Sequence, residues 1–410
     1  MRLVEGYDGQ RPELEKTRSV FEQEQEKTEG LGPATLRSAT VLTNRSVSTN
    51  GTQTTTVRCT ALLAPAGSLM FDRANMHNLC PPALSPSRPN TMRMKLLFEL
   101  SGEHPDLPAA ELECVGTVLD RRIQVAVAEC PEPEAAGRLA LTHVVMEYLG
   151  ECEPTRAAFT DLLRDLAITT EKPFVGRGKM IQGSRMDIER LDLERLIGSL
   201  IAGPVSLCNP VEEYRAVASE DRCYFGRVIL KIDRGAFEAR NPMRRPFFHP
   251  GVMMPRMARA LVNISLVRPG ETVFDPFCGT GGILLEAREI GVRILGSDFD
   301  PAMVDGYRQN LPGSDVLIAD ATTVPVCDGA LDAVVTDLPY GQSVRIRADS
   351  MDRLYDGSLA EIRRILRPGR RAVVVTHRDI TDIAARHFTV LQEHEQRVHK
   401  SLTRRILVLG

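Results

Sequence analysis

The chain has 410 residues, of which 43% are hydrophobic and 26% are charged, and its net charge at pH 7 is −3. This length allows two or three domains with separate cores, and the slightly negative charge argues against nucleic-acid binding through an overall positive field. The sequence predicts no membrane-spanning segment, because no apolar run reaches the roughly 20 residues that a spanning helix needs.

The nine cysteines form no Cys-x-x-Cys pair, and the eight histidines show no spacing typical of metal ligands. An odd number of cysteines without such pairs argues against a disulfide framework or a structural zinc site. The N-terminus also lacks the basic segment and apolar stretch of a secretory signal. We therefore expect a cytoplasmic protein that binds no metal.

Residues 1–93 differ in composition from the rest of the chain. A Glu/Gln/Lys-rich start is followed by a Ser/Thr/Asn stretch and a proline-rich segment, with no sustained helical or strand period. This composition predicts a disordered extension. A second interpretation is that translation begins at Met92 or Met94, in which case the extension does not belong to the native protein.

Residues 94–238 predict a mixed α+β region, with a division near residue 151. The expected strands are 95–100, 122–127, 213–217 and 223–232, and the expected helices are 108–115, 139–149, 155–167 and 192–201. Alternating apolar residues indicate the strands, and apolar residues three and four positions apart indicate the helices. Residues 239–252 follow as a proline-punctuated linker.

From residue 253 to residue 410, helices and strands alternate regularly. The expected helices are 253–266, 282–290, 301–310, 351–366 and 379–387, and the expected strands between them are 271–275, 292–297, 315–319, 331–336 and 371–376. This alternation predicts an α/β fold with a parallel sheet covered by helices on both faces. The last two strands, 388–396 and 403–409, are too close in sequence for a crossover helix, so they should pair antiparallel.

The segment Asp275-Pro-Phe-Cys-Gly-Thr-Gly-Gly282 predicts a strand that breaks into a glycine-rich turn and opens a helix. In such a sheet, ligands bind at the carboxyl ends of the strands where the winding reverses. Asp298 and Asp320 end the next two strands, where they are placed to accept hydrogen bonds from ribose hydroxyls and an adenine amine. The predicted cofactor-binding residues are Asp275, Phe277, Gly279, Gly281, Asp298, Asp320 and Ala321.

Two cofactor classes suit this spacing. A dinucleotide site places pyrophosphate on the helix N-terminus, whereas an acid, Asp275, precedes this glycine turn. S-adenosylmethionine carries an amine and a sulfonium, both of which Asp275 would attract. The sequence therefore favours the methyl donor, and a dinucleotide remains the alternative.

The segment Asp337-Leu-Pro-Tyr340 follows another predicted strand and suits a flat base with an exocyclic amine. Such an amine is a poor nucleophile, so catalysis means orienting it and accepting its protons. Asp337 and the Leu338 carbonyl can accept hydrogen bonds from the amine, and Pro339 fixes the turn. The Tyr340 ring can stack on the base, although an aromatic residue that only packs is the other interpretation. These four residues are the predicted catalytic group.

Together, these two segments resemble the amino-methyltransferase branch of the class I methyltransferases. The lead-in Arg245-Pro-Phe-Phe-His-Pro-Gly251 and the segment Leu97-Phe-Glu-Leu-Ser-Gly-Glu-His104 narrow the likeness, and Leu193-Glu-Arg-Leu-Ile-Gly198 resembles a THUMP domain, which is an RNA-binding module. The chain is thus similar to the archaeal tRNA guanine-10 N2-methyltransferase family over about residues 94–410.

The resemblance implies a Rossmann-like class I methyltransferase sheet, parallel with an antiparallel last strand, over residues 253–410. It also implies a ferredoxin-like domain over 94–151 and a THUMP domain over 152–238. The implied activity transfers one or two methyl groups from S-adenosylmethionine to the N2 amine of a guanine in tRNA. A small activating subunit is a further partner to be tested, and the oligomeric state stays open.

One departure and one set of arginines accompany this resemblance. Position 338 is leucine, where the broader pattern often has proline, but its carbonyl is retained. The arginines expected to contact RNA are Arg244 and Arg245 in the linker and Arg345 and Arg347 in a loop. Another basic cluster near the end, which includes Arg404 and Arg405, is by itself typical of a solvated face.

Two other classes of function remain open from the sequence. The Asp-x-Pro-Tyr segment also suits methylation of an amine in ribosomal RNA, in DNA or in a protein glutamine. A non-catalytic RNA-binding protein could retain the same fold. The acid, proline and tyrosine together argue against that last class, because a binding module does not need them.

Overall fold

The computed structural model describes residues 38–42, 58–63, 69–71, 93–340, 348–399 and 402–410. The chain divides into two compact units, Met1–Leu79 and Cys80–Gly410. No helix in the described ranges is long and apolar enough to cross a membrane.

The first unit contains a small antiparallel sheet in the order β1-β2-β3. Its strands are β1 (Ser38–Leu42), β2 (Arg58–Leu63) and β3 (Leu69–Phe71). The sequence analysis expects no regular structure here, so these strands differ from the prediction. Strands of three to six residues are too short to leave a periodic signal. The remaining residues before position 93 lie outside the described ranges.

Residues 94–231 form one mixed seven-stranded sheet in the order β5-β6-β4-β7-β10-β9-β8. Its strands are β4 (Met94–Leu100), β5 (Thr117–Arg122), β6 (Val125–Cys130), β7 (Thr142–Cys152), β8 (Phe174–Met180), β9 (Glu212–Ser219) and β10 (Arg222–Lys231). The helices are α2 (Leu107–Leu112), the 3₁₀ helix η2 (Pro133–Arg138), α3 (Arg156–Leu166) and α4 (Arg190–Leu200). All neighbouring strands pair antiparallel except β8 and β9.

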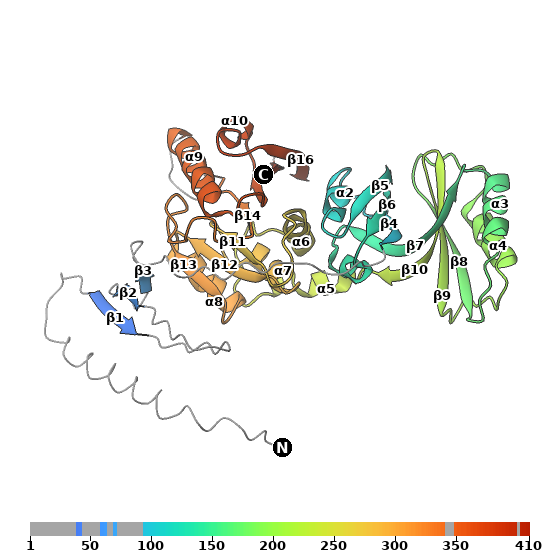
Figure 1. Cartoon of the computed structure of the whole chain (residues 1–410), viewed down its shortest axis with the longest axis horizontal. Coiled ribbons are helices and arrows are strands. Elements are labelled where there is room, and N and C mark those ends of the chain that lie inside the picture. The colour runs from blue at the N-terminus through green and yellow to red at the C-terminus, as the bar shows by residue number, and fades with distance from the viewer. Residues whose placement is uncertain (1–37, 43–57, 64–68, 72–92, 341–347, 400–401) are drawn as a thin grey trace, which may run out of the picture. The chain divides into compact units, whose positions relative to one another are not determined.

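The sheet is continuous across the domain boundary predicted at residues 151 and 152. Strands β7 and β10 pair from Cys152 opposite Cys223 to Val144 opposite Lys231, so they extend through both halves. Figure 1 shows α2 beside one half and α3 and α4 beside the other. Each half has its own apolar cluster. The predicted boundary thus falls inside a paired strand.

Strand β7 corrects the predicted helix over residues 139–149. Val144, Val145 and Met146 are all at most 5% exposed, so successive residues are buried on both faces of the sheet. A strand buried on both faces loses its alternation and can be mistaken for a helix.

Two further differences from the predicted strands concern turns and glycines. The predicted strand over 122–127 is divided by a turn between β5 and β6, where Gln124 has a φ of 58°. Strand β8 escapes the sequence analysis because Gly176 and Gly178 interrupt its pattern. A Cβ at Gly176 would lie 2.7 Å from Ile197 of α4, so glycine allows this close packing.

The α/β architecture predicted for residues 253–410 is confirmed. Its seven strands have the order β13-β12-β11-β14-β15-β17-β16. They are β11 (Thr272–Asp275), β12 (Arg293–Asp298), β13 (Asp315–Ile318), β14 (Ala333–Asp337), β15 (Ala372–Thr376), β16 (Val390–His399) and β17 (Leu402–Leu409). The first five are parallel, and β17 is antiparallel to both of its neighbours, as the sequence predicts.

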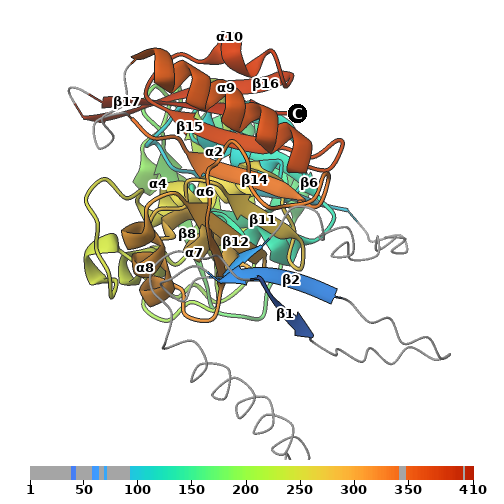
Figure 2. The same ribbon diagram turned by 90° about the vertical axis from the view of Figure 1, so that its left-hand side faces the viewer.

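Helices cover both faces of this sheet. The helices from residue 234 onward are α5 (Arg234–Ala239), the 3₁₀ helix η3 (Pro242–Arg244), α6 (Pro255–Ile264), α7 (Gly282–Arg288), α8 (Pro301–Asn310), α9 (Ala348–Ile365) and α10 (Thr381–Ala384). One large apolar cluster includes α6 and α7, and another includes α9, which lies across β14 and β15 in Figure 2. Strand order reverses between β11 and β14, and the carboxyl ends of these two strands therefore mark the expected ligand crevice.

A buried acid joins the two regions of the second unit. Glu111 of α2 is fully buried and accepts hydrogen bonds from the backbone N–H groups of Ala140 and Leu141, both at 2.8 Å. The side-chain amide of Asn263, on α6, also donates to it at 2.7 Å. Arg138 donates to the Asn263 oxygen at 2.7 Å, which fixes the orientation of that amide.

Candidate active site

The glycine turn after β11 is shaped by two residues with positive φ. Gly279 has a φ of 49° and Gly281 a φ of 84°. A Cβ at Gly281 would lie 2.5 Å from Leu311 and 2.8 Å from Tyr307, so only glycine fits there. A Cβ at Gly279 would have no described atom within 4 Å. The backbone at Gly279 is therefore open to a ligand.

Asp298, at the end of β12, holds this turn in place. Its Oδ2 accepts a hydrogen bond from the Gly279 N–H and its Oδ1 from the Asp300 N–H, each at 2.9 Å. Burial raises the pKa of Asp298, while the backbone donors lower it. Each carboxylate oxygen can accept a second hydrogen bond, so Asp298 can also receive ribose hydroxyls.

Asp275, at the end of β11, is buried with one oxygen fully engaged. Its Oδ1 accepts hydrogen bonds from the Thr336 hydroxyl at 2.6 Å and from the Phe277 N–H at 3.0 Å. These two protein donors leave Oδ2 available for a ligand. Burial, together with the nearby charges of Asp298 and Asp337, raises the pKa of Asp275 to about 7.

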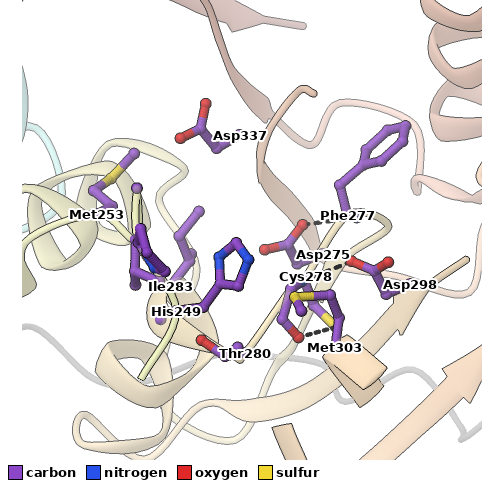
Figure 3. A pocket seen from close by; sticks show the side chains of 15 residues that line it. His249, Met253, Asp275, Phe277, Cys278, Thr280, Ile283, Asp298, Met303 and Asp337 are labelled. Carbon is purple, nitrogen blue, oxygen red and sulfur yellow. Dashed lines mark hydrogen bonds between the residues drawn. The ribbon is translucent and has the colours of Figure 1, made fainter. Parts of the chain in front are cut away.

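A cavity of about 240 Å³ opens beside these acids. Its walls come from the linker before α6, the glycine turn, and the ends of β12 and β14. The lining residues include His249, Met253, Asp275, Thr280, Asp298, Met303 and Asp337. Figure 3 shows the imidazole of His249 in front of Asp275, with Asp337 across the cavity from both.

The chemistry of the lining distinguishes the two cofactor classes. Three carboxylates face this small space, so an anionic pyrophosphate would be repelled and a cationic ligand attracted. The hydroxyl of Thr280 is buried and, among the described residues, has no hydrogen-bond partner. Together with Asp275 Oδ2 and the open backbone at Gly279, it offers polar contacts that an adenosyl amino acid would satisfy. The residues present therefore fit S-adenosylmethionine.

The second predicted segment lies at the far side of the same cavity. The Tyr340 hydroxyl donates to Asp337 Oδ1 at 2.8 Å, and the Tyr355 hydroxyl donates to the Pro339 carbonyl at 2.7 Å. Burial raises the pKa of Asp337 to about 6, although the charge of Arg404 lowers it. A carboxyl with this pKa is mostly ionised at pH 7 and can accept a hydrogen bond from an amine.

The comparisons with known proteins agree with this geometry. A family model described as an RMKL-like methyltransferase domain matches residues 242–406. The tRNA (guanine(10)-N2)-dimethyltransferase of Methanothermobacter thermautotrophicus is 33% identical over 77% of this chain and 99% of its own length. The enzyme of the same name from Pyrococcus abyssi is 30% identical over 76% of this chain and 98% of its own length. The chain belongs to this dimethyltransferase family.

The chain was also compared with solved structures. The crystal structure of TrmN from Thermus thermophilus covers 77% of this chain and is itself covered over 99%, with 21% identity and a TM-score of 0.45.

Most of the residues predicted for the cofactor meet in the cavity. Asp275, Phe277, Gly279 and Asp298 line it, and Gly281 shapes the turn. The lining, as far as the described residues show, does not include Asp320 or Ala321. Asp320 is exposed, and its Oδ1 accepts the Thr322 N–H and hydroxyl at 2.8 Å. Strand β13 ends at Ile318, so Asp320 already belongs to the following turn.

These contacts describe only part of the site predicted for the base, which consists of Asp337, Leu338, Pro339 and Tyr340. Leu338 is 1% exposed and packs in the apolar cluster under α9, while its N–H donates to Val375 at 2.9 Å. Its side chain therefore belongs to the core. The role of its carbonyl stays a prediction.

The arginines predicted for RNA differ from one another. Arg244 is exposed and lies 4.0 Å from Glu238. Arg245 is half-buried: its Nε donates to the Arg240 carbonyl, and its two terminal nitrogens are buried without a described partner. Terminal nitrogens buried in this way are not exposed to an RNA phosphate in this conformation, and the RNA contact of Arg245 stays a prediction. Arg345 and Arg347 lie outside the described residues.

Sequence reasoning also missed residues at the site. His249 lines the cavity, although the sequence analysis does not single it out, and the Thr336 hydroxyl donates to Asp275 from the neighbouring strand. Neither contact leaves a signal in sequence, because each depends on how strands and linker meet. Cys278 lines the same cavity, but burial raises the pKa of its thiol well above the usual value, which argues against a nucleophilic role.

Proposed function

We propose that this protein transfers one or two methyl groups from S-adenosylmethionine to the N2 amine of a guanine in tRNA, at position 10. One observation supports it above the others: Asp337 of the Asp-Leu-Pro-Tyr segment lines the same cavity as Asp275 and the glycine turn. The relatives that share most of this chain carry that activity in their names.

The residues divide the work between two sides of the cavity. Asp275 and the open backbone at Gly279 hold the cofactor, which supplies an electrophilic methyl group when bound. Asp337 receives the amine of the base. Because Asp337 Oδ1 already accepts from Tyr340, Oδ2 is the oxygen that orients the amine.

Tyr340 is placed to stack on the base that carries this amine. Its ring centroid lies 4.8 Å from that of His377, and the planes of the two rings are tilted by 46°. The bond between its hydroxyl and Asp337 fixes the ring relative to the acid. Base stacking and amine orientation are thereby coupled through one side chain.

We infer that residues 94–231 bring the tRNA to this site. The support is the THUMP-like segment on α4, which packs against one continuous sheet, and this region is joined to α6 through Glu111 and Asn263. No disulfide joins the seven cysteines within residues 93–340, which suits a reducing cytoplasm.

The test incubates the protein with labelled S-adenosylmethionine and an unmodified tRNA transcript, followed by nucleoside analysis. We expect label in N2-methylguanosine and N2,N2-dimethylguanosine, and none with the Asp337→Ala variant or with a transcript that carries adenosine at position 10. Labelling of ribosomal RNA, DNA or a protein glutamine instead would show that the substrate is wrong. tRNA binding without any transfer would favour a non-catalytic RNA-binding protein.

A further inference from the structure

The antiparallel strand β17 places an arginine, Arg404, at the edge of the sheet where the candidate active site lies. In a parallel sheet, only the carboxyl ends of strands meet at this edge. Because β17 is reversed, its first residues lie there instead, and Arg405 pairs opposite Thr376 at the end of β15. Arg404, the preceding residue, is therefore brought next to the end of β14.

The Arg404 side chain is buried and lies against both Tyr340 and Asp337 of the segment predicted to bind the base. It is 8% exposed. Its Nε donates to the Tyr340 hydroxyl at 3.2 Å, and one terminal nitrogen lies 3.9 Å from Asp337 Oδ2. Tyr340 in turn donates to Asp337 Oδ1, so the three side chains form a closed triangle.

The next residue, Arg405, is a basic residue whose side chain lies on the opposite face of β17 from that of Arg404. It forms ion pairs with Glu393 at 2.8 Å, Glu395 at 2.9 Å and Asp379 at 3.6 Å, and it is partly exposed. These pairs lie among solvated side chains, where ion pairs contribute little to stability. Arg405 is therefore a matched control for its neighbour.

We propose that Arg404 is a positioning residue of the reaction: it holds the Tyr340 hydroxyl and the Asp337 carboxylate in the orientation that receives the target base. The proposal rests on the proposed function. Burying a guanidinium is costly, and an apolar residue would often serve the fold as well or better. The cost is explained if the charge is needed beside the acid.

The positive charge of Arg404 acts on the pKa of Asp337 together with the other groups around this acid. The groups that titrate or carry charge around it are Tyr340 in its own turn, Asp275 from β11, Tyr355 from α9, His249 from the linker, His377 beyond the tyrosine ring and Arg404 from β17. Asp275 disfavours the ionised form of Asp337 when it is itself charged. Arg404 is the cation that counteracts burial and lowers the pKa of Asp337.

The test compares Arg404→Met, Arg404→Lys and the control Arg405→Met, with wild type, in three measurements. The first is kcat/KM for tRNA methylation from pH 5 to pH 9. The second is the titration of Asp337 by ¹³C NMR without tRNA, assigned with Asp337→Asn. The third is thermal unfolding, together with affinity for S-adenosylhomocysteine.

We expect Arg404→Met to lower kcat about 100-fold, the scale of a lost orientation, with little change in KM. In the plot of kcat/KM against pH, the rise on the acidic side (the acidic limb) should move up by about one pH unit, and so should the pKa of Asp337 measured by NMR. Arg404→Lys should restore the pH at which the acidic limb lies but not the full rate, because lysine lacks the planar guanidinium group. Unfolding temperature and S-adenosylhomocysteine affinity should stay near those of wild type, and Arg405→Met should match wild type throughout.

An Asp337 titration that stays in place in Arg404→Met would overturn the proposal, as would an equal effect of Arg405→Met. A lower unfolding temperature with an unmoved acidic limb would also overturn it, because that result assigns Arg404 to the fold. Failure of the proposed function would look different: wild type would methylate no tRNA guanine, while the NMR titration would still report whether Arg404 acts on Asp337.

Discussion

Glu111 and Asp275 are carboxylates buried to a similar degree, at 0% and 2% exposure, but their hydrogen bonds differ. Both oxygens of Glu111 accept donors from the chain, three in total. Asp275 receives two donors on a single oxygen, and its other oxygen faces a cavity. Glu111, whose two oxygens both accept hydrogen bonds from the chain, has a structural role. Asp275 has one oxygen without a donor from the chain, and this oxygen can accept a hydrogen bond from a ligand.

The largest effect is expected when the structural acid, Glu111, is removed. Glu111→Ala leaves three buried donors unpaired, so we expect the free energy of unfolding to fall by about 3–5 kcal/mol. Urea unfolding measures this change, and Glu129→Ala, which removes an exposed ion pair with Arg93, is the control. A loss as small as that of the control would contradict the assignment of Glu111 as the central acid of this contact.

Asp275→Asn tests the other acid. The amide oxygen can still accept from Thr336 and Phe277, so the fold should be retained, and stability at pH 8 should not decrease because a buried charge is removed. Affinity for S-adenosylhomocysteine should fall roughly 10- to 100-fold with the lost charge-assisted hydrogen bond. Calorimetry gives the affinity, and unchanged binding would mean that Asp275 does not touch the ligand.

The pH dependence of binding sharpens the same contrast. The pKa of Asp275 is about 7 in the free protein, and a cationic ligand favours its ionised form, which lowers this pKa on binding. Affinity for S-adenosylhomocysteine, whose amine is positively charged, should therefore fall as pH drops below 7, by up to about tenfold per unit. Binding in this range should release protons, seen as a dependence of the calorimetric heat on buffer. Asp275→Asn should lose both effects, and a wild-type affinity that is flat between pH 5.5 and 7 would refute the linkage.

The smallest expected effect concerns the support of Asp275. Thr336→Val removes the 2.6 Å hydrogen bond to Oδ1, so the pKa of Asp275 should rise further and the affinity at pH 7 should fall about 3-fold. At pH 9, where the acid is ionised in both proteins, the difference should largely disappear. An equal loss at both pH values would point to altered geometry instead.

The two acids also show what the sequence can and cannot predict. Asp275 is found from its place before a glycine turn, because strand, turn and helix are local in the chain. Glu111 precedes its main partner Asn263 by 152 positions, so it looks like any acid on a short helix. Arg404 is missed for the same reason, since its role depends on the reversal and pairing of β17.

The fold follows the same rule. Alternating helices and strands over 253–410 are predicted well, because each amphipathic element carries its own period. The regions predicted poorly are those where neighbours remove the period, such as β7, which is buried on both faces, and β8, where glycines accommodate α4. Asp320 lies two residues beyond the observed end of β13, in the following turn, and its contact with the cofactor stays a prediction.

The shared strands β7 and β10 bear on how this protein can be divided and recombined. A fragment that begins at residue 152 would carry β10 without the strand beside it and would expose a row of unpaired backbone groups. The smallest piece that could be transplanted as a cassette therefore begins at β4 and ends after β10. Recombination between relatives would then have to exchange both halves of the sheet together, and the two halves should share one evolutionary history.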